Sequence, residues 1–120
     1  MTTDEAQIEE EIVSKGKIAP RLTPAMIDAQ IAGYVCGRAS DLWKDVPHSK
    51  ELECLTLCVM TLKNGFTLVG KSACASPENY DAEIGAKIAI DDARKQIWAL
   101  EGYALRNALT GRAPFNEALR

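Results

Sequence analysis

The fold is decided by residues 81–109, which read DAEIGAKIAIDDARKQIWALEGYALRNAL. From Ala86 to Ala108, apolar residues recur in this stretch every three or four positions. That spacing places them on one face of an α-helix, and charged residues occupy the opposite face. We therefore predict one long amphipathic helix with Asp81 as its N-cap and Gly111 just after its last turn.

The length of this helix raises a question about its far end. At 1.5 Å per residue, an unbroken helix would span about 40 Å, more than a compact chain of 120 residues needs. Gly102 lies inside the helix, and glycine there costs about 1 kcal/mol relative to alanine. Two outcomes are open: a continuous helix whose far end is covered by another subunit, or a break at Gly102.

A β-hairpin is predicted immediately before the helix, in the sequence LTLCVMTLKNGFTLVGKSAC of residues 55–74. Asn64–Gly65 between two apolar runs is typical of a two-residue type I′ turn. In that register Met60 opposes Val69. Both hairpin faces are apolar, and two strands alone are marginally stable. We therefore expect a third strand or strand pairing between subunits.

Two shorter helical patterns precede the hairpin. Thr23–Pro24 combines an N-cap threonine with proline at the first helical position, which predicts a helix running to about Cys36. Residues 2–15 have partial helical spacing and are expected to be a short helix or a disordered arm. The predicted class is α+β: a short N-terminal helix, a central hairpin with a third strand as one option, and a long C-terminal helix.

Composition predicts one domain across residues 1–120, with a loose arm at 1–20 and a flexible tail at 112–120. Apolar residues make up 47% and charged residues 26%, values ordinary for a soluble protein. The net charge of −3 argues against a protein that binds nucleic acid through its phosphates. The chain has no run of 18 apolar residues, and its acidic start lacks the features of a signal peptide. We expect a cytoplasmic protein with no membrane association.

No metal or cofactor site is predicted. The chain has no CxxC pair, and its metal-type ligands beyond the carboxylates are Cys36, Cys54, Cys58, Cys74 and His48. Cys54 and Cys58 lie four residues apart in a predicted strand, so their side chains are about 13 Å apart. That separation is too large for a shared ion. Reduced, partly buried thiols are the expected state.

Polar residues gather where the hairpin meets the long helix. No nucleotide-binding loop, nucleophile elbow or zinc-protease motif is present, so no catalytic residue is proposed. A ligand site at this junction would draw on Lys71, Asn79, Tyr80, Glu83, Lys87, Asp91 and Arg94. The helix N-terminus would favour an anion there. The alternative is a solvated salt-bridge face without a ligand.

Self-association is the expected use of the surplus apolar surface. Two strands and a few helices cannot cover both hairpin faces and the whole helix stripe in one subunit, and large exposed apolar patches mark interfaces. A two-fold dimer is the commonest arrangement. Trp98, Tyr103 and Leu105, toward the far end of the helix, are the predicted contact residues.

Several short motifs resemble one known family. They are TLKNGF at 61–66, the G-x-S-x-C of Gly70, Ser72 and Cys74, AEIG-x-KIA at 82–89, DDA at 91–93 and IW-x-LEGY at 97–103. PAMIDAQIAGY at 24–34 resembles the N-terminal helix of the same family. The combination is similar to the small tailed-phage protein family known by genes forty-nine and sixty-six of two phages. Ala99 stands where that family often has proline, which should leave the helix straighter.

The resemblance implies a phage or prophage gene product made in the cytoplasm of an infected or lysogenic bacterium, and not a virion component. It implies no enzymatic chemistry. Three hypotheses remain: a non-enzymatic protein that binds a host factor or a nucleotide-type signal, a small enzyme using Lys71, Glu83, Lys87 and Asp91, or an accessory subunit of a phage nucleic-acid machine. The sequence names neither the ligand nor the oligomer number.

Overall fold

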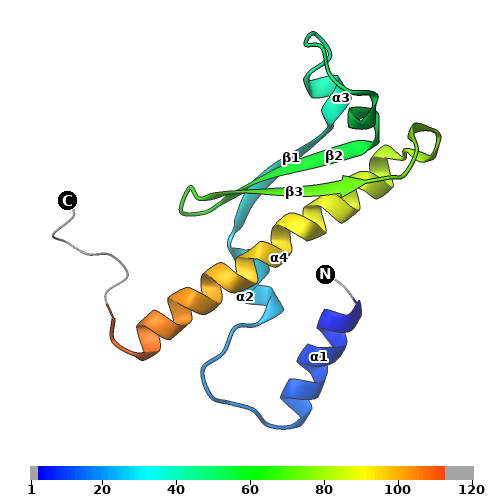
Figure 1. Ribbon diagram of the computed structural model, residues 1–120. Helices are drawn as coiled ribbons and strands as arrows, with labels where there is room; N and C mark the ends of the chain where they lie inside the picture. Colours follow the sequence, from blue (N-terminus) through cyan, green and yellow to red (C-terminus); the bar gives the residue numbers. More distant parts are fainter. Residues whose placement is uncertain (1–2, 113–120) are drawn as a thin grey trace, which may run out of the picture.

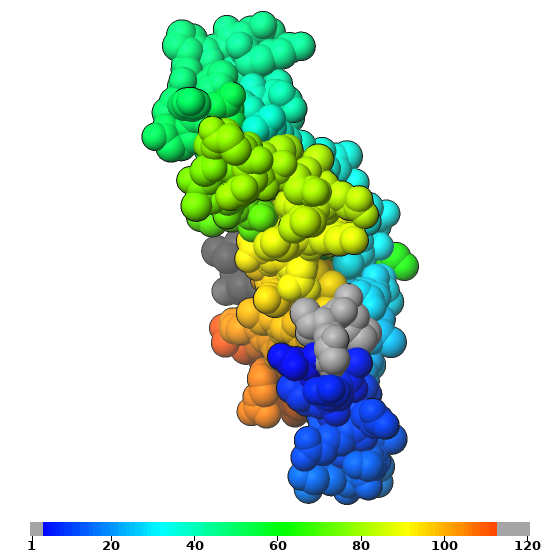
Figure 2. Space-filling model, turned by 90° about the vertical axis from the view of Figure 1, so that its right-hand side faces the viewer, coloured from blue at the N-terminus to red at the C-terminus, as the bar shows by residue number. Residues whose placement is uncertain are grey.

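The computed structural model describes residues 3–112, and Figure 1 shows a three-stranded sheet lying along one long helix. In chain order the elements are α1 (Thr3–Ser14), α2 (Pro24–Ala29), β1 (Ile31–Arg38), α3 (Ala39–Leu42), η1 (Lys50–Cys54), β2 (Leu55–Leu62), β3 (Thr67–Ala73), η2 (Pro77–Asn79) and α4 (Ala82–Leu109). The α+β prediction is confirmed. The segment 39–54 and helix α1 lie at opposite ends of the molecule (Figure 2).

Helix α4 begins and ends as its sequence predicts. The Asp81 carboxylate accepts a hydrogen bond from the Ile84 N–H at 3.0 Å, which caps the first turn. Gly111, with a φ of +71°, follows Thr110, the C-cap residue of α4. The helix runs without interruption past Gly102. The break at Gly102, one of the two outcomes considered, does not occur.

The third strand comes from a segment for which a helix was predicted, and that prediction is wrong. Thr23 does cap a helix, with its hydroxyl accepting from the Met26 N–H at 3.3 Å, but α2 ends at Ala29. Residues 31–38 instead form β1, which pairs antiparallel with β2 in the sheet order β1-β2-β3. The sequence IAGYVCG contains glycines and β-branched or aromatic residues, which weaken a helix and suit a strand beside β2.

The hairpin turn is also not of the predicted type. A type I′ turn requires positive φ at both Asn64 and Gly65, yet Gly65 alone of the two has it, at +89°. The Leu62 N–H donates to the Phe66 carbonyl at 2.8 Å, so three residues lie between the paired ends of the strands. A glycine in the left-handed region is typical of such three-residue loops.

The longer loop shifts the register of β3 by one residue. Met60 pairs with Leu68, and Val59 pairs with Val69. Because side chains alternate along a strand, this shift exchanges the two faces of β3. Leu68 joins Met60 in the core, and Val69 lies on the opposite face.

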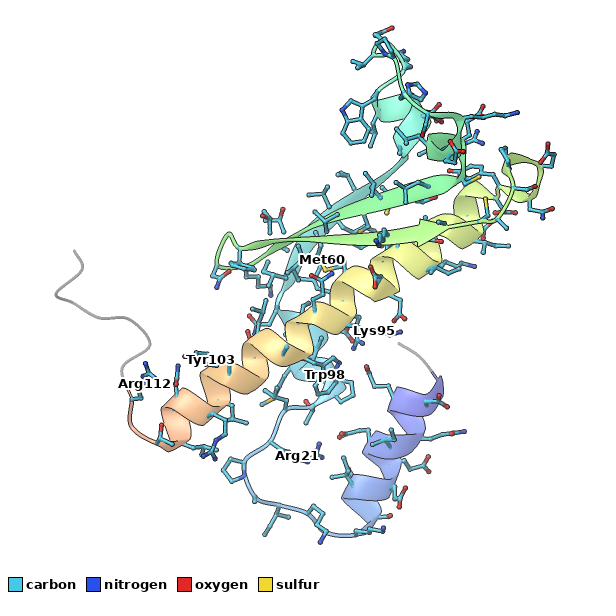
Figure 3. The ribbon with its side chains drawn as sticks, in the orientation of Figure 1. Arg21, Met60, Lys95, Trp98, Tyr103 and Arg112 are labelled. Atoms are coloured by element: carbon cyan, nitrogen blue, oxygen red, sulfur yellow. The ribbon has the colours of Figure 1, made fainter. Side chains whose placement is uncertain are left out.

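One face of the sheet packs on α4 and forms the core. Figure 3 shows Met60 between the sheet and the helix, and Met60 and Cys58 are fully buried. The buried cluster consists of Ile27, Cys58, Met60, Leu62, Leu68, Ala89, Ala93 and Ile97. At Gly70 the backbones of β3 and α4 approach so closely that a Cβ would overlap the Ala89 carbonyl oxygen.

Candidate functional site

The face of the sheet that points away from α4 carries a row of exposed valines. Val35 pairs with Val59 on the neighbouring strand, and Val59 pairs with Val69. Their side chains are exposed by 71%, 42% and 56%, respectively. We call these three residues the valine row. Helix α4 packs on the opposite side of the sheet (Figure 1), and α3 reaches the valine side at Gly37, where its Leu42 side chain lies.

A shallow hollow opens beside the valine row at the outer strand. It has a volume of about 290 Å³ and is lined by Ala32, Gly33, Tyr34, Val35, Val59 and Thr61. Gly33 supplies no side chain there, and a Cβ at this position would meet nothing within 4 Å. The lining contains no charged residue. An uncharged, aliphatic surface of this kind suits contact with apolar side chains of another protein.

The junction between hairpin and helix holds only two of the seven predicted ligand residues. Asn79 and Tyr80 help to line a cavity of about 120 Å³. The Arg38 guanidinium lies 3.9 Å from the centre of the Tyr80 ring, and its Nε donates to the Glu53 carbonyl at 2.6 Å. Small-molecule sites usually enclose about 300–1,000 Å³, so this cavity suits water or a small ion.

Three other predicted ligand residues lie on the exposed side of α4 in solvated ion pairs. Lys87 pairs with Glu83 at 3.4 Å, and Asp91 pairs with Lys95 at 3.2 Å. Exposed pairs of this type contribute about 0–1 kcal/mol and need no ligand to explain them. Lys71 is exposed on β3 and adjoins α4 through its backbone N–H. The arrangement favours the salt-bridge alternative.

Arg94, the last of the seven, lies apart from the others and is buried beneath α1. Its guanidinium donates to both carboxylate oxygens of Glu5 at 2.8 Å and to Asp28 at 2.7 Å. The Arg94 hydrogen bonds hold the pKa of Glu5 below its ordinary value of 4.5. The Trp98 indole N–H also donates to Glu5, at 3.3 Å. Arg94 therefore docks α1 and is not available to a junction site.

A larger, apolar groove with an acidic rim lies between α1 and the rest of the molecule. Its volume is about 380 Å³, and it is lined by Asp4, Glu5, Ile8, Glu9, Ile12, Leu22, Pro24 and Trp98. Arg21, which flanks it, is paired with Glu9 at 2.7 Å. Two of the three carboxylates on the rim, Glu5 and Glu9, are paired with Arg94 and Arg21, so these arginines are already occupied and are not free to bind an anionic ligand.

The four cysteines form two neighbouring pairs across the sheet. Cys36 pairs with Cys58 in the register of β1 and β2, and the Cys74 N–H donates to the Cys54 carbonyl at 3.0 Å. All four are free thiols. Burial raises the pKa of Cys58 to about 12, and the Cys36 thiol adds to this rise. Within residues 3–112, no group of three or more His, Cys, Asp or Glu side chains is placed to hold a metal ion.

The predicted contact residues at the far end of α4 differ in their surroundings. Trp98 is half-buried against the core and α1, whereas Tyr103 is 63% exposed and Leu105 is half-buried. No residue of α4 after Ile97 is buried. This end of the helix therefore still exposes apolar surface, although Trp98 itself packs against other parts of the same chain.

The valine row was not predicted from the sequence, because the segment of Val35 was expected to be helical and the hairpin register was expected one residue away from the observed one. The alternating apolar residues of β2 were the available signal, but they left open which face α4 would cover. Sequence reasoning also missed the pairing of Glu5 with Arg94, which joins residues 89 positions apart. No spacing rule finds such a pair.

Comparison with known protein families gives a match. Residues 22–109 match the model of the Phage protein (N4 Gp49/phage Sf6 gene 66) family, which covers most of the chain and includes β1, the hairpin and α4. No curated protein and no solved structure matches the chain. In the described part of the chain, no helix is long and apolar enough to cross a membrane.

Proposed function

Because this chain belongs to the N4 Gp49/phage Sf6 gene 66 family of phage proteins, we propose that it is an accessory protein that binds a host protein through the valine row. It catalyses no reaction itself and acts in the cytoplasm of the infected or lysogenic bacterium. The bound host protein is inhibited or redirected.

The exposed valine row is the observation that carries this proposal. Three β-branched side chains, 42–71% exposed, lie side by side on a rigid sheet beside an uncharged hollow. Leaving apolar surface in water costs roughly 25 cal/mol per Å². A monomer gains nothing from such a contiguous patch, whereas a binding protein uses it for affinity.

A host protein is favoured over a nucleotide-type signal as the ligand. Phosphates are bound by cationic side chains and free backbone N–H groups. The groove large enough for a nucleotide has Asp4, Glu5 and Glu9 around it. The junction cavity of about 120 Å³ is too small. The valine row, by contrast, is uncharged and apolar, so its binding energy would come from contact with apolar side chains of a protein.

The test compares two equivalent substitutions on different surfaces. Val59→Lys places a charge at the centre of the valine row. Val13→Lys makes the same exchange at a position of α1 that is 63% exposed. A tagged chain is used to isolate a partner from bacterial lysate, and the purified partner is then titrated against each variant. We expect Val59→Lys to weaken binding at least tenfold and Val13→Lys to leave it unchanged.

Two results would contradict the proposal. The first is equal affinity of the partner for wild type and Val59→Lys, which would place binding elsewhere. The second is a rise in melting temperature of several degrees with one member of a nucleotide panel, because that would identify a nucleotide as the ligand.

A further inference from the structure

The two edges of the sheet differ in how their backbone groups are satisfied. On the β3 edge, the Lys71 N–H donates to the Asp92 carboxylate at 2.9 Å. The Gln96 side-chain amide donates to the Val69 carbonyl at 2.8 Å. Both partners project from α4, so the helix occupies the hydrogen-bonding groups of this edge. A further strand cannot pair there without displacing them.

The opposite edge is formed by β1, and its outward groups follow from the ladder pattern. The Leu62 N–H bonds to the Phe66 carbonyl, and the Cys74 N–H bonds to the Cys54 carbonyl. Even-numbered residues of β2 thus bond to β3. Because antiparallel bonding alternates, odd-numbered residues of β2 bond to β1.

The partners of these odd-numbered residues in β1 are Gly33, Val35 and Gly37. The backbone N–H and C=O groups of the residues between them therefore point away from the sheet. These outward residues are Tyr34 and Cys36, whereas Ala32 lies in the register irregularity between Ile31 and Gly33, where the simple alternation stops. No described side chain is hydrogen-bonded to them.

Residues 33–37 follow the register irregularity between Ile31 and Gly33 and precede Arg38, and they lack two of the usual devices that prevent edge pairing. They contain no charged residue and no proline. Tyr34 is 51% exposed on this strand. No helix lies along this edge in Figure 1, in contrast to the β3 edge. An open, neutral, apolar edge is a template for another strand.

We propose that a second copy of this chain pairs with the β1 edge in antiparallel orientation, with the two-fold axis at Val35. The two sheets then form one continuous six-stranded sheet. A neutral edge can meet its own copy without placing like charges on the axis. In this register Val35 opposes Val35 of the partner subunit, and the valine row continues without a step from one copy into the other.

The available surface is sufficient for such a contact. The chain exposes 8541 Å², whereas a folded chain of 13.1 kDa exposes about 6,400 Å². Although α1 and the far end of α4 contribute to this difference, it exceeds the roughly 800 Å² per partner that a standard interface covers. The inference does not rest on the proposed host protein, because it is argued from the backbone groups of the β1 edge, whereas the host-protein proposal is argued from the exposed valine side chains.

The first experiment removes one outward N–H from each edge in turn. In Tyr34→Pro the lost N–H has no partner within the chain, and proline is tolerated at such edge positions. Thr67→Pro is the matched control, because Thr67 lies on the β3 edge with its N–H also outward. Sedimentation velocity at micromolar concentration should give a dimer for wild type and Thr67→Pro, and a monomer for Tyr34→Pro.

The second experiment reports the register and does not depend on the proline variant folding. Val35→Cys in a Cys36→Ser background places two thiols across the two-fold axis. One oxidised glutathione accepts the two electrons: a disulfide forms between the subunits, the glutathione disulfide is cleaved, and the two thiol protons end on the two reduced glutathione molecules that leave. We expect a covalent dimer on a non-reducing gel, and none from Cys36→Ser alone. A monomeric wild type, or a Tyr34→Pro dimer without the Val35→Cys cross-link, would overturn the proposal.

Discussion

Gly70→Ala is predicted to be among the most damaging single-methyl additions in this protein. An added Cβ would lie 2.5 Å from the Ala93 backbone N and would overlap the Ala89 carbonyl oxygen. Ordinary contact begins at about 3.5 Å, so β3 and α4 would have to separate by about 1 Å. Both neighbours are backbone atoms of a helix and cannot rotate away. Overpacking of this kind costs about 3 kcal/mol.

The predicted loss is large enough to measure by thermal unfolding. For a chain of this size, 3 kcal/mol lowers the melting temperature by roughly 12 °C. Circular dichroism at one fixed protein concentration would record it, since an oligomer melts at a concentration-dependent temperature.

Two glycines of α4 provide controls. A Cβ at Gly102 would meet nothing within 4 Å, so Gly102→Ala should raise stability by about 1 kcal/mol through helix propensity. A Cβ at Gly85 would meet the Thr56 hydroxyl at 2.5 Å. Because that side chain can rotate, Gly85→Ala should have an intermediate effect. If Gly70→Ala melted within 2 °C of wild type, the close approach of β3 and α4 would be refuted.

Two further predictions concern the hairpin turn and the docking of α1. Gly65→Val should lower the free energy of unfolding by about 1–3 kcal/mol, because a β-branched residue is strained at positive φ. Asn64→Asp keeps an acceptor for the Phe66 N–H and should lower it by only a few tenths of a kcal/mol. Equal melting temperatures of the two variants would disprove the turn geometry. The depressed pKa of Glu5 means that its pairing stabilises α1 docking above pH 4.5 and that this stability is lost as the pH falls through the folded-state pKa. In a Trp43→Phe variant, the fluorescence of Trp98 should therefore change as the pH falls below 4.5. Adding Glu5→Gln should abolish this change. If the fluorescence change persisted in that variant, a group other than Glu5 would be responsible for it.

The sequence by itself determined the local features of this fold. The caps at Thr23 and Asp81 are confirmed because a side chain bonds to a backbone N–H only three residues away. The period of residues 81–109 similarly predicted α4, since its core-facing residues lie within one helix. The motifs within 22–109 also identified the phage family.

Only the tertiary structure decided which strands pair and in which register. Residues 31–38 became β1 because β2 offers hydrogen-bonding groups on its second edge, a gain that short-range spacing in the sequence does not contain. One extra loop residue then exchanged the faces of β3. That shift put Leu68 under α4 and brought Val69 into the valine row.

The candidate surface was unpredictable for the same reason. The valines at 35, 59 and 69 come from three strands, and their adjacency depends on two registers fixed by long-range pairing. Whether they are exposed depends on which face α4 covers, and this was settled by the close fit at Gly70. Capping hydrogen bonds and helical spacing join residues three or four positions apart, so they can be predicted from the sequence. Packing joins residues dozens of positions apart, so only the folded chain decided where the exposed apolar surface lies.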